Sequence, residues 1–160
     1  MTAIGATDQS APDVAALVVE ALCQELGDRL LAVVLFGSRA REDARKTSDW
    51  DVLVIAEDLP EKLFARRLYL KQLLPLSCRG AVSILARTPS EFKASLPALY
   101  LDIALDGRVY YDPTGYVARE LAALKQLMSQ VGLYRERTSA GDIWRWQTEP
   151  TIDWRLAWQR

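Results

Sequence analysis

The sequence predicts a single α/β (α+β) domain in which helices pack on a small β-sheet. Its 160 residues, with 50% hydrophobic and 26% charged positions, suit one compact core. Short continuous apolar runs alternate along the chain with segments whose apolar positions recur at helical spacing, and no internal repeat is present. A chain of this length buries about 70% of the surface that its unfolded form exposes, so it needs neither a disulfide nor a structural metal.

The first half of the chain contains two predicted helices and three predicted strands. The first helix carries apolar residues at helical spacing and ends at Gly27, and Pro75 ends the second because proline cannot continue a helix. The strands are short continuous apolar runs, as expected of strands that are buried on both faces. The predicted order is helix 12–26, strand 30–36, strand 50–56, helix 60–74 and strand 80–86.

The second half begins with Thr88, Pro89 and Glu91, which have the form of a capping box with proline at the first helical position. A helix is expected to start there. The remaining elements are a helical stretch from Pro97 to Asp106, an edge strand over 108–111, and a helix with Val117, Leu121, Leu124 and Met128 on one face that ends before Gly132.

The last 28 residues differ in composition, so we divide the chain into a domain over 1–132 and a tail over 133–160. The tail holds four of the five tryptophans, namely Trp144, Trp146, Trp154 and Trp158. Trp154 and Trp158 are spaced to share one face of a terminal helix. Two interpretations remain open: the tail completes the core, since tryptophan is chiefly a packing residue, or it binds a partner, since alternating tryptophan and arginine are enriched at binding hot spots.

The chain has no histidine, which excludes Ser-His and Cys-His nucleophile pairs and His-ligated zinc. Any catalysis must therefore depend on carboxylates, lysine, arginine, tyrosine or a metal bound through oxygen. With 20 Lys and Arg against 21 Asp and Glu, the net charge of −1 gives no overall basic field, and hence no strong signal for nucleic acid.

Cysteine usage and hydropathy predict a cytoplasmic protein. Cys23 and Cys78 lack CxxC spacing and are expected to be free thiols in a reducing compartment. No apolar run approaches ~20 residues, and residues 1–10 lack the pattern of a signal peptide, so no membrane contact is expected. Self-association stays open.

The most informative stretch is a Gly-Ser pair that follows the first strand and an Asp-x-Asp pair that opens the second. Gly37 lets the backbone approach a ligand closely, and if Ser38 begins a short helix, its hydroxyl and nearby amides suit a phosphate. Asp49 and Asp51 are two residues apart, so their side chains leave on one face, where hard oxygen ligands favour Mg²⁺ or Mn²⁺. The alternative is an ordinary turn with strand-capping aspartates.

The spacing Gly37-Ser38-x10-Asp49-x-Asp51 after an apolar strand resembles the signature of the DNA polymerase β-like nucleotidyltransferase superfamily. The chain is similar in particular to its minimal nucleotidyltransferases, which include the MntA-type antitoxins paired with HEPN toxins. Residues 88–92 and 106–112 resemble further segments of these proteins, so the resemblance covers about residues 12–130. It implies a small mixed β-sheet flanked by helices, which is the polymerase β-like nucleotidyltransferase fold.

The resemblance also implies an activity: transfer of a nucleoside monophosphate, AMP from ATP, to a hydroxyl acceptor. Two acceptors stay open, a side chain of a partner protein, which the short chain favours, and a small molecule. The partner that the resemblance implies is a HEPN-type protein. The implied cofactor is Mg²⁺ or Mn²⁺, and the implied substrate is an NTP. The implied site residues are Gly37, Ser38 and Arg39 (or Arg41) for the nucleotide, and Asp49 and Asp51 for the metal and catalysis.

One position departs from the family's pattern, because Ser83 stands where a third carboxylate is expected on the strand before the Thr-Pro segment. Serine is neutral and a poor metal ligand. Either another acid substitutes, with Glu57, Glu91 and Asp102 as candidates, or the protein binds nucleotide with weak or no turnover. The second case predicts an antitoxin-like or regulatory subunit that keeps the fold and binds a helical partner through the Trp-rich tail.

Overall fold

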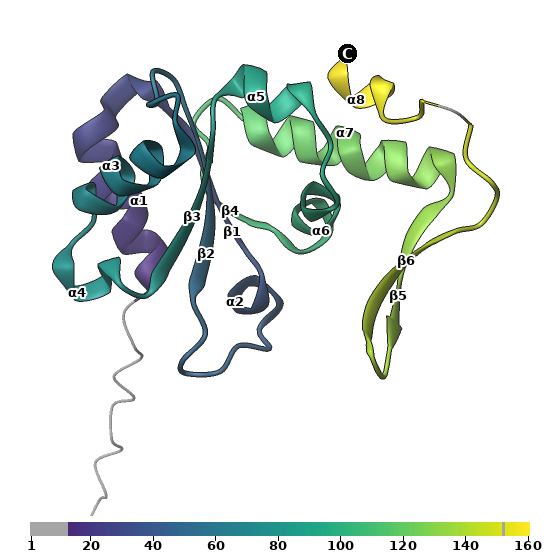
Figure 1. Cartoon of the computed structure of the whole chain (residues 1–160), viewed down its shortest axis with the longest axis horizontal. Coiled ribbons are helices and arrows are strands. Elements are labelled where there is room, and N and C mark those ends of the chain that lie inside the picture. Colours follow the sequence, from purple (N-terminus) through teal and green to yellow (C-terminus); the bar gives the residue numbers. More distant parts are fainter. Residues whose placement is uncertain (1–12, 152) are drawn as a thin grey trace, which may run out of the picture.

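A four-stranded mixed β-sheet forms the centre of the computed structural model, which describes residues 13–151 and 153–160 (Figure 1). The strand order is β3-β2-β1-β4. β1 pairs antiparallel with β2 and with the edge strand β4, whereas β3 runs parallel to β2. The bounds are β1 (Leu30–Phe36), β2 (Trp50–Ala56), β3 (Val82–Arg87) and β4 (Arg108–Tyr111). The predicted mixed α/β fold is therefore confirmed.

Helices cover both faces of the sheet, which explains why the strands read as continuous apolar runs. On one face lie α1 (Val14–Leu26), α3 (Leu63–Leu73) and α4 (Leu76–Arg79), and on the other α5 (Pro89–Ala94), α6 (Ala98–Asp106) and α7 (Tyr116–Val131) (Figure 1). Consecutive β1 residues alternate between the two cores: Val33 belongs to the first and Val34 to the second. Cys23 and Cys78 are free.

The predicted elements agree with the structure, with small shifts at their ends. The helix expected over 60–74 begins at Leu63, and the third strand begins at Val82. The capping box is present, since Thr88 Oγ1 accepts from the Glu91 amide and Glu91 accepts from the Thr88 amide. The expected start of the first helix at Pro12, and the polar leader, lie outside the described residues. No helix within the described ranges is long and apolar enough to cross a bilayer.

The tail contains a β-hairpin that the sequence did not predict. β5 (Leu133–Thr138) and β6 (Gly141–Trp146) pair antiparallel, and α8 (Leu156–Gln159) follows. The expected helix over Trp154 and Trp158 is wrong in its extent, because Trp154 lies before α8 and packs edge-to-face against Trp146, with ring centroids 5.3 Å apart.

The end of the tail packs on the domain through one buried tryptophan. The Trp158 indole Nε1 donates to the carbonyls of Phe92 and Ser95, 3.1 Å away in each case. Its ring lies edge-to-face against Phe92, and the side chain joins the core between α5 and α7. The hairpin by contrast keeps Tyr134 and Ile143 exposed. The tail thus combines packing at α8 with exposed apolar side chains on the hairpin, and the domain boundary at residue 132 stays a prediction.

A buried ion pair joins α3 to the start of α5. The guanidinium of Arg66, only 2% exposed, donates to both Glu91 carboxylate oxygens at 2.7 and 2.9 Å. Arg66 also donates to the carbonyls of Pro60 and Ala86. The hydrogen bond from Arg66 lowers the pKa of Glu91 to about 2, and the Thr88 amide adds to this effect. The charged form of Glu91 therefore stabilises the folded state.

We expect Glu91→Gln to reduce the free energy of unfolding by about 2 kcal/mol at pH 7, because it leaves a buried arginine without its counter-charge. The expected loss is smaller than for a fully buried ion pair, because the Glu91 side chain is 42% exposed and solvent screens its charge. Since the folded pKa lies below the unfolded value of 4.5, the stabilisation is complete above about pH 4.5 and is lost as the pH falls towards 2. Urea unfolding at pH 7 and pH 3 measures this effect: the difference in free energy of unfolding between the wild type and Glu91→Gln should be smaller at pH 3 than at pH 7.

The matched control is Glu136→Gln, which removes an ion pair of Glu136 with Arg145 in which both side chains are about half exposed. Such a pair contributes about 0.5 kcal/mol or less. Equal losses in the two variants would contradict the role given to burial of Arg66.

Candidate functional site

The Gly-Ser pair lies where β1 passes into a short helix. Gly37 follows the end of β1 at φ +72°, and α2 (Ser38–Arg41) begins directly after it. The Gly37 carbonyl accepts from the amides of Ala40 and Arg41, each at 3.1 Å. The first amides of a helix have no partner earlier in it, so those of Ser38 and Arg39 are available to an anion. Ser38 thus begins a short helix, which is the condition under which the sequence predicts a phosphate site.

Asp51 lies beside Gly37 because Phe36 and Asp51 are partners in the antiparallel register of β1 and β2. A Cβ atom built on Gly37 would come within 2.4 Å of Asp51 Oδ2. The space beside this glycine is therefore filled by the carboxylate of Asp51. The sequence associated the glycine with close approach to a ligand, but the group that approaches it in the structure is the proposed metal-binding side chain.

Asp49 and Ser83 complete the surroundings of Asp51. Asp49 is exposed immediately before β2, and Ser83 is the partner of Asp51 in the parallel register of β2 and β3. The pKa of Asp51 is raised, first by burial and second by the negative charge of Asp49, while the Ser83 hydroxyl and Arg41 oppose the shift. Two close carboxylates, one of them partly buried, are an arrangement that a cation stabilises.

Two of the three proposed substitutes for a third carboxylate lie away from this end of the sheet, and the third, Asp102 on α6, lines a hollow with Arg41 and Asp43 but is engaged by an arginine. Glu57 and Glu91 follow the C-terminal ends of β2 and β3, whereas Asp51 and Ser83 lie near the N-terminal ends. Asp102 accepts from Arg135 at 3.0 Å. Across residues 13–151 and 153–160, no group of three or more His, Cys, Asp or Glu side chains could hold a metal ion.

Two carboxylates are nevertheless enough for one class of metal site. Mg²⁺ usually keeps several waters and binds through one or two carboxylates together with substrate phosphates. The donor set of Asp49 and Asp51, with a phosphate-binding helix start at Gly37, fits this pattern. A cage made of protein ligands alone is not offered by the described residues around Asp51.

Arg39 holds the loop that leads to Asp49. Its guanidinium donates to the carbonyl of Ser48 at 2.9 Å and to that of Lys46 at 3.3 Å, and it lies 4.7 Å above the Trp50 ring. These contacts fix the loop between α2 and β2 and so position Asp49. A direct contact of Arg39 with phosphate stays a prediction.

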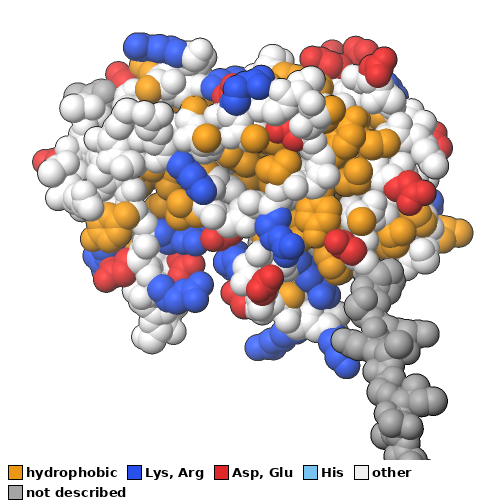
Figure 2. Space-filling model, turned by 180° about the vertical axis from the view of Figure 1, so that it is seen from behind, with side chains coloured by type: hydrophobic (Ala, Val, Ile, Leu, Met, Phe, Trp, Pro, Cys, Tyr) orange, Lys and Arg blue, Asp and Glu red, His pale blue; other side chains and the backbone are white. Residues whose placement is uncertain are grey.

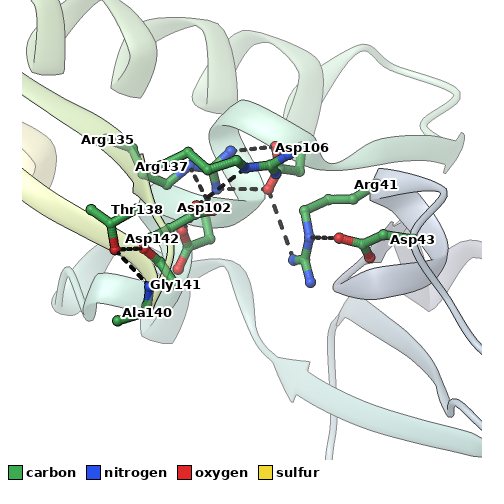
Figure 3. A network of polar contacts seen from close by, with 10 residues as sticks. All are labelled: Arg41, Asp43, Asp102, Asp106, Arg135, Arg137, Thr138, Ala140, Gly141 and Asp142. Carbon is green, nitrogen blue, oxygen red and sulfur yellow. Dashed lines mark hydrogen bonds and ion pairs between the residues drawn. The ribbon is translucent and has the colours of Figure 1, made fainter.

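Arg41 links the motif to α6 and the hairpin through a chain of charges (Figure 3). Its Nε lies 3.3 Å from Asp43 Oδ2, and its Nη1 lies 4.0 Å from Asp106 Oδ2. Asp106 in turn accepts two hydrogen bonds of 2.7 Å from Arg135 on β5, which lower its pKa. The sequence did not predict this network, because Arg41, Asp106 and Arg135 lie 29 or more residues from one another and share no local pattern.

The mixed sheet and its helices form a nucleotidyltransferase fold, and comparison with known proteins agrees. Residues 16–111 match the family model described as "Nucleotidyltransferase domain". Over 112 residues, which are 68% of this chain and 76% of the relative, the chain is 30% identical to the "Putative protein adenylyltransferase MJ1305" of Methanocaldococcus jannaschii. The chain therefore belongs to the nucleotidyltransferase domain family.

Two solved structures are similar to this chain at low sequence identity. One, described as a toxin-antitoxin with AMP-PNP, has a TM-score of 0.51 and 18% identity and covers 72% of this chain and 90% of that chain. The other, described as a toxin-antitoxin MntA-HpeT mutant, has a TM-score of 0.49 and 18% identity, covering 71% and 88%. The first supports the nucleotidyltransferase fold predicted from the motif.

The contact between Gly37 and Asp51 can be tested through stability. We expect Gly37→Ala to lower the free energy of unfolding by about 2 kcal/mol more than Gly27→Ala, because the new Cβ collides with the Asp51 carboxylate. Gly27 is the matched control: its φ is +54°, but a Cβ there meets no atom within 4 Å. Urea unfolding measures both. Equal destabilisation would contradict the close approach of Asp51.

Proposed function

We propose that this chain transfers AMP from ATP to a hydroxyl group on a partner protein and releases pyrophosphate. The observation that carries the proposal is the placement of Asp51 against Gly37, at the start of α2, with the charge of Asp49 close to Asp51. Nucleotidyl transfer depends mostly on positioning and charge neutralisation, which a phosphate cradle beside a cation site supplies. The adenylyltransferase name of the relative, and the ATP analogue AMP-PNP named with a similar fold, support adenine as the base.

In this proposal Asp49 and Asp51 hold Mg²⁺, or Mn²⁺, which when bound neutralises the charge of the phosphates and polarises the α-phosphoryl group. Ser38 binds the β- and γ-phosphates at the start of α2, where the preceding Gly37 lets them approach the backbone amides closely. Arg39 keeps the loop of Asp49 in place. These residues orient the triphosphate so that its α-phosphorus faces the acceptor.

The chemical step needs no histidine. The acceptor hydroxyl oxygen forms a bond to the α-phosphorus as the bond from this phosphorus to the pyrophosphate oxygen breaks. The hydroxyl proton passes to water, because the exposed side chains of Asp49 and Ser83 leave this end of the sheet open to solvent.

A second candidate function is favoured by Ser83. With serine beside Asp51, and no cluster of three acids among the described residues, turnover in this second candidate is weak or absent. The chain would then act as a nucleotide-binding antitoxin or regulatory subunit of a HEPN-type partner. The toxin-antitoxin described for a structure of similar fold supports this context.

One experiment separates these candidates. The protein is incubated with Mg²⁺, α-labelled ATP and the protein encoded by the adjacent gene, and both chains are examined for label. Label on the partner supports transfer. If Mg²⁺-ATP raises the melting temperature but no label appears, the regulatory function is supported, and if Mg²⁺-ATP has no effect on melting, both candidates fail.

A further inference from the structure

The segment between Glu61 and Glu91 differs in charge from the rest of the chain. It contains no acidic residue, although the whole chain has a net charge of −1. It forms α3, α4 and β3, which lie together at one side of the sheet (Figure 1). Its basic residues are Lys62, Arg66, Arg67, Lys71, Arg79 and Arg87.

Most of these charges have no acidic counterpart. Among the residues that the structure describes, only Arg66 has a carboxylate within ion-pair distance, that of Glu91. Lys71 and Arg79 donate to backbone carbonyls, which do not cancel a charge. On the face seen in Figure 2, in contrast, acidic and basic side chains both occur, with hydrophobic side chains between them. The uncompensated charge on α3, α4 and β3 is therefore a local property.

The same region exposes large apolar side chains. Leu63 is 63% exposed, Phe64 78% and Leu68 50%, all on α3, and Leu76 at the start of α4 is 83% exposed. Phe64 and Leu68 are spaced i and i+4, so they lie on one face of the helix. Contiguous exposed apolar side chains bordered by polar groups mark interaction sites.

This surface is continuous with the nucleotidyl-transfer site. A groove of about 110 Å³ is lined by Leu63, Arg66 and Arg67 together with residues 84–87 of β3. A second hollow, of about 200 Å³, is lined by Asp49, Ser83, Arg67 and Ile84 among others. Arg67 and Ile84 line both, so the groove along β3 leads from Leu63 to Asp49.

We propose that the outer face of α3 and α4, with the groove along β3, is the docking surface for the acceptor protein, and that it recognises an acidic surface carrying exposed hydrophobic side chains. The inference rests on the proposed function, because it supplies the acceptor for that reaction. A second copy of this chain is disfavoured as the occupant, since pairing this face with itself would oppose two sets of uncompensated positive charges. An acidic partner gains from the same charges.

The test uses a defined probe, a fluorescent amphipathic peptide of glutamate with leucine and phenylalanine, with a lysine-for-glutamate version as its negative control. Arg67→Glu should weaken binding of the acidic peptide about tenfold, and Phe64→Ser several-fold, whereas Lys125→Glu on the exposed side of α7 should not. Equal affinity of Arg67→Glu and Lys125→Glu would overturn the proposal.

Two further measurements test the alternative partners of this surface, a membrane and a second copy of the chain. Tighter binding to phosphatidylserine vesicles than to the peptide, lost in Arg67→Glu, would overturn the proposal in favour of a membrane surface. A dimer in sedimentation velocity that Phe64→Ser dissociates would overturn it in favour of a second copy. Phe64 is 78% exposed, so Phe64→Ser should keep the melting temperature of the wild type.

The failure of this inference is distinguishable from failure of the proposed function. Phe64→Ser leaves Asp49, Asp51 and Gly37 intact, so it should keep the rise in melting temperature caused by Mg²⁺-ATP while reducing transfer to the acceptor protein. Unchanged transfer in Phe64→Ser overturns the docking surface alone. Absence of the Mg²⁺-ATP effect in the wild type overturns the proposed function, and the peptide experiment then still tests the surface.

Discussion

Asp51→Asn is expected to reduce the rate of AMP transfer at least about a hundredfold without unfolding the protein. Asparagine matches the size of aspartate and so keeps the fit beside Gly37, but it removes the charge that would hold the cation. Release of labelled pyrophosphate or labelling of the acceptor measures the loss. The rise in melting temperature caused by Mg²⁺-ATP should shrink in parallel, because the affinity for the metal-bound nucleotide falls.

Without nucleotide, the same substitution should leave the folded state as stable as the wild type or more stable. The pKa of Asp51 is raised above 3.8 by burial and by Asp49, so the folded state favours the neutral carboxyl. Wild-type stability then decreases as the pH rises from 3.8 through the folded pKa, and the variant lacks this decrease. Urea unfolding at pH 4 and pH 7 measures the change in stability with pH for the wild type and for Asp51→Asn.

Asp28→Asn is the control, since Asp28 is an exposed aspartate outside the site. It should keep wild-type transfer. If Asp51→Asn transfers AMP at the wild-type rate while Mg²⁺-ATP still binds, the metal and catalytic role of this carboxylate is wrong.

The sheet was predictable where burial leaves a continuous apolar pattern. β1 and β2 are covered on both faces, and the apolar runs of residues 30–36 and 50–56 coincide with them. The hairpin of β5 and β6 could not be predicted in this way, because it is mostly exposed and has polar residues on both strands. Arg135 holds it to Asp102 and Asp106 on α6, and such distant ion pairs leave no periodic signal.

The candidate site was predictable as a set of residues but not as an arrangement. Motif spacing indicated that Gly37 and Asp51 belong to one site. Their contact depends on the register of β1 against β2, which pairs Phe36 with Asp51. The alternation of side chains between the two faces of a strand does not determine which residues of two strands are paired. The role of Arg39 in holding the loop before Asp49 could not be predicted either. Its acceptors are backbone carbonyls, which every residue has, so the sequence does not show which of them Arg39 reaches.

Ser83→Asp is expected to increase the rate of AMP transfer about a hundredfold, because it places a third carboxylate beside Asp51 that can accept the proton of the acceptor hydroxyl. Ser83 is exposed on β3, so the new side chain needs no buried space. Initial rates of labelling at saturating Mg²⁺-ATP measure the change. In the absence of metal the variant should be less stable than the wild type, since three close carboxylates repel one another.

Ser83→Asn is the matched control, because it has the size of aspartate without its charge. It should neither accelerate transfer nor destabilise the metal-free protein. If the wild type shows no turnover while Ser83→Asp does and Ser83→Asn does not, serine at this position is what makes the chain a nucleotide-binding subunit instead of an enzyme. If Ser83→Asp binds Mg²⁺-ATP yet transfers no faster than the wild type, the proton does not leave through this position, and release to water at the open end of the sheet is the better account.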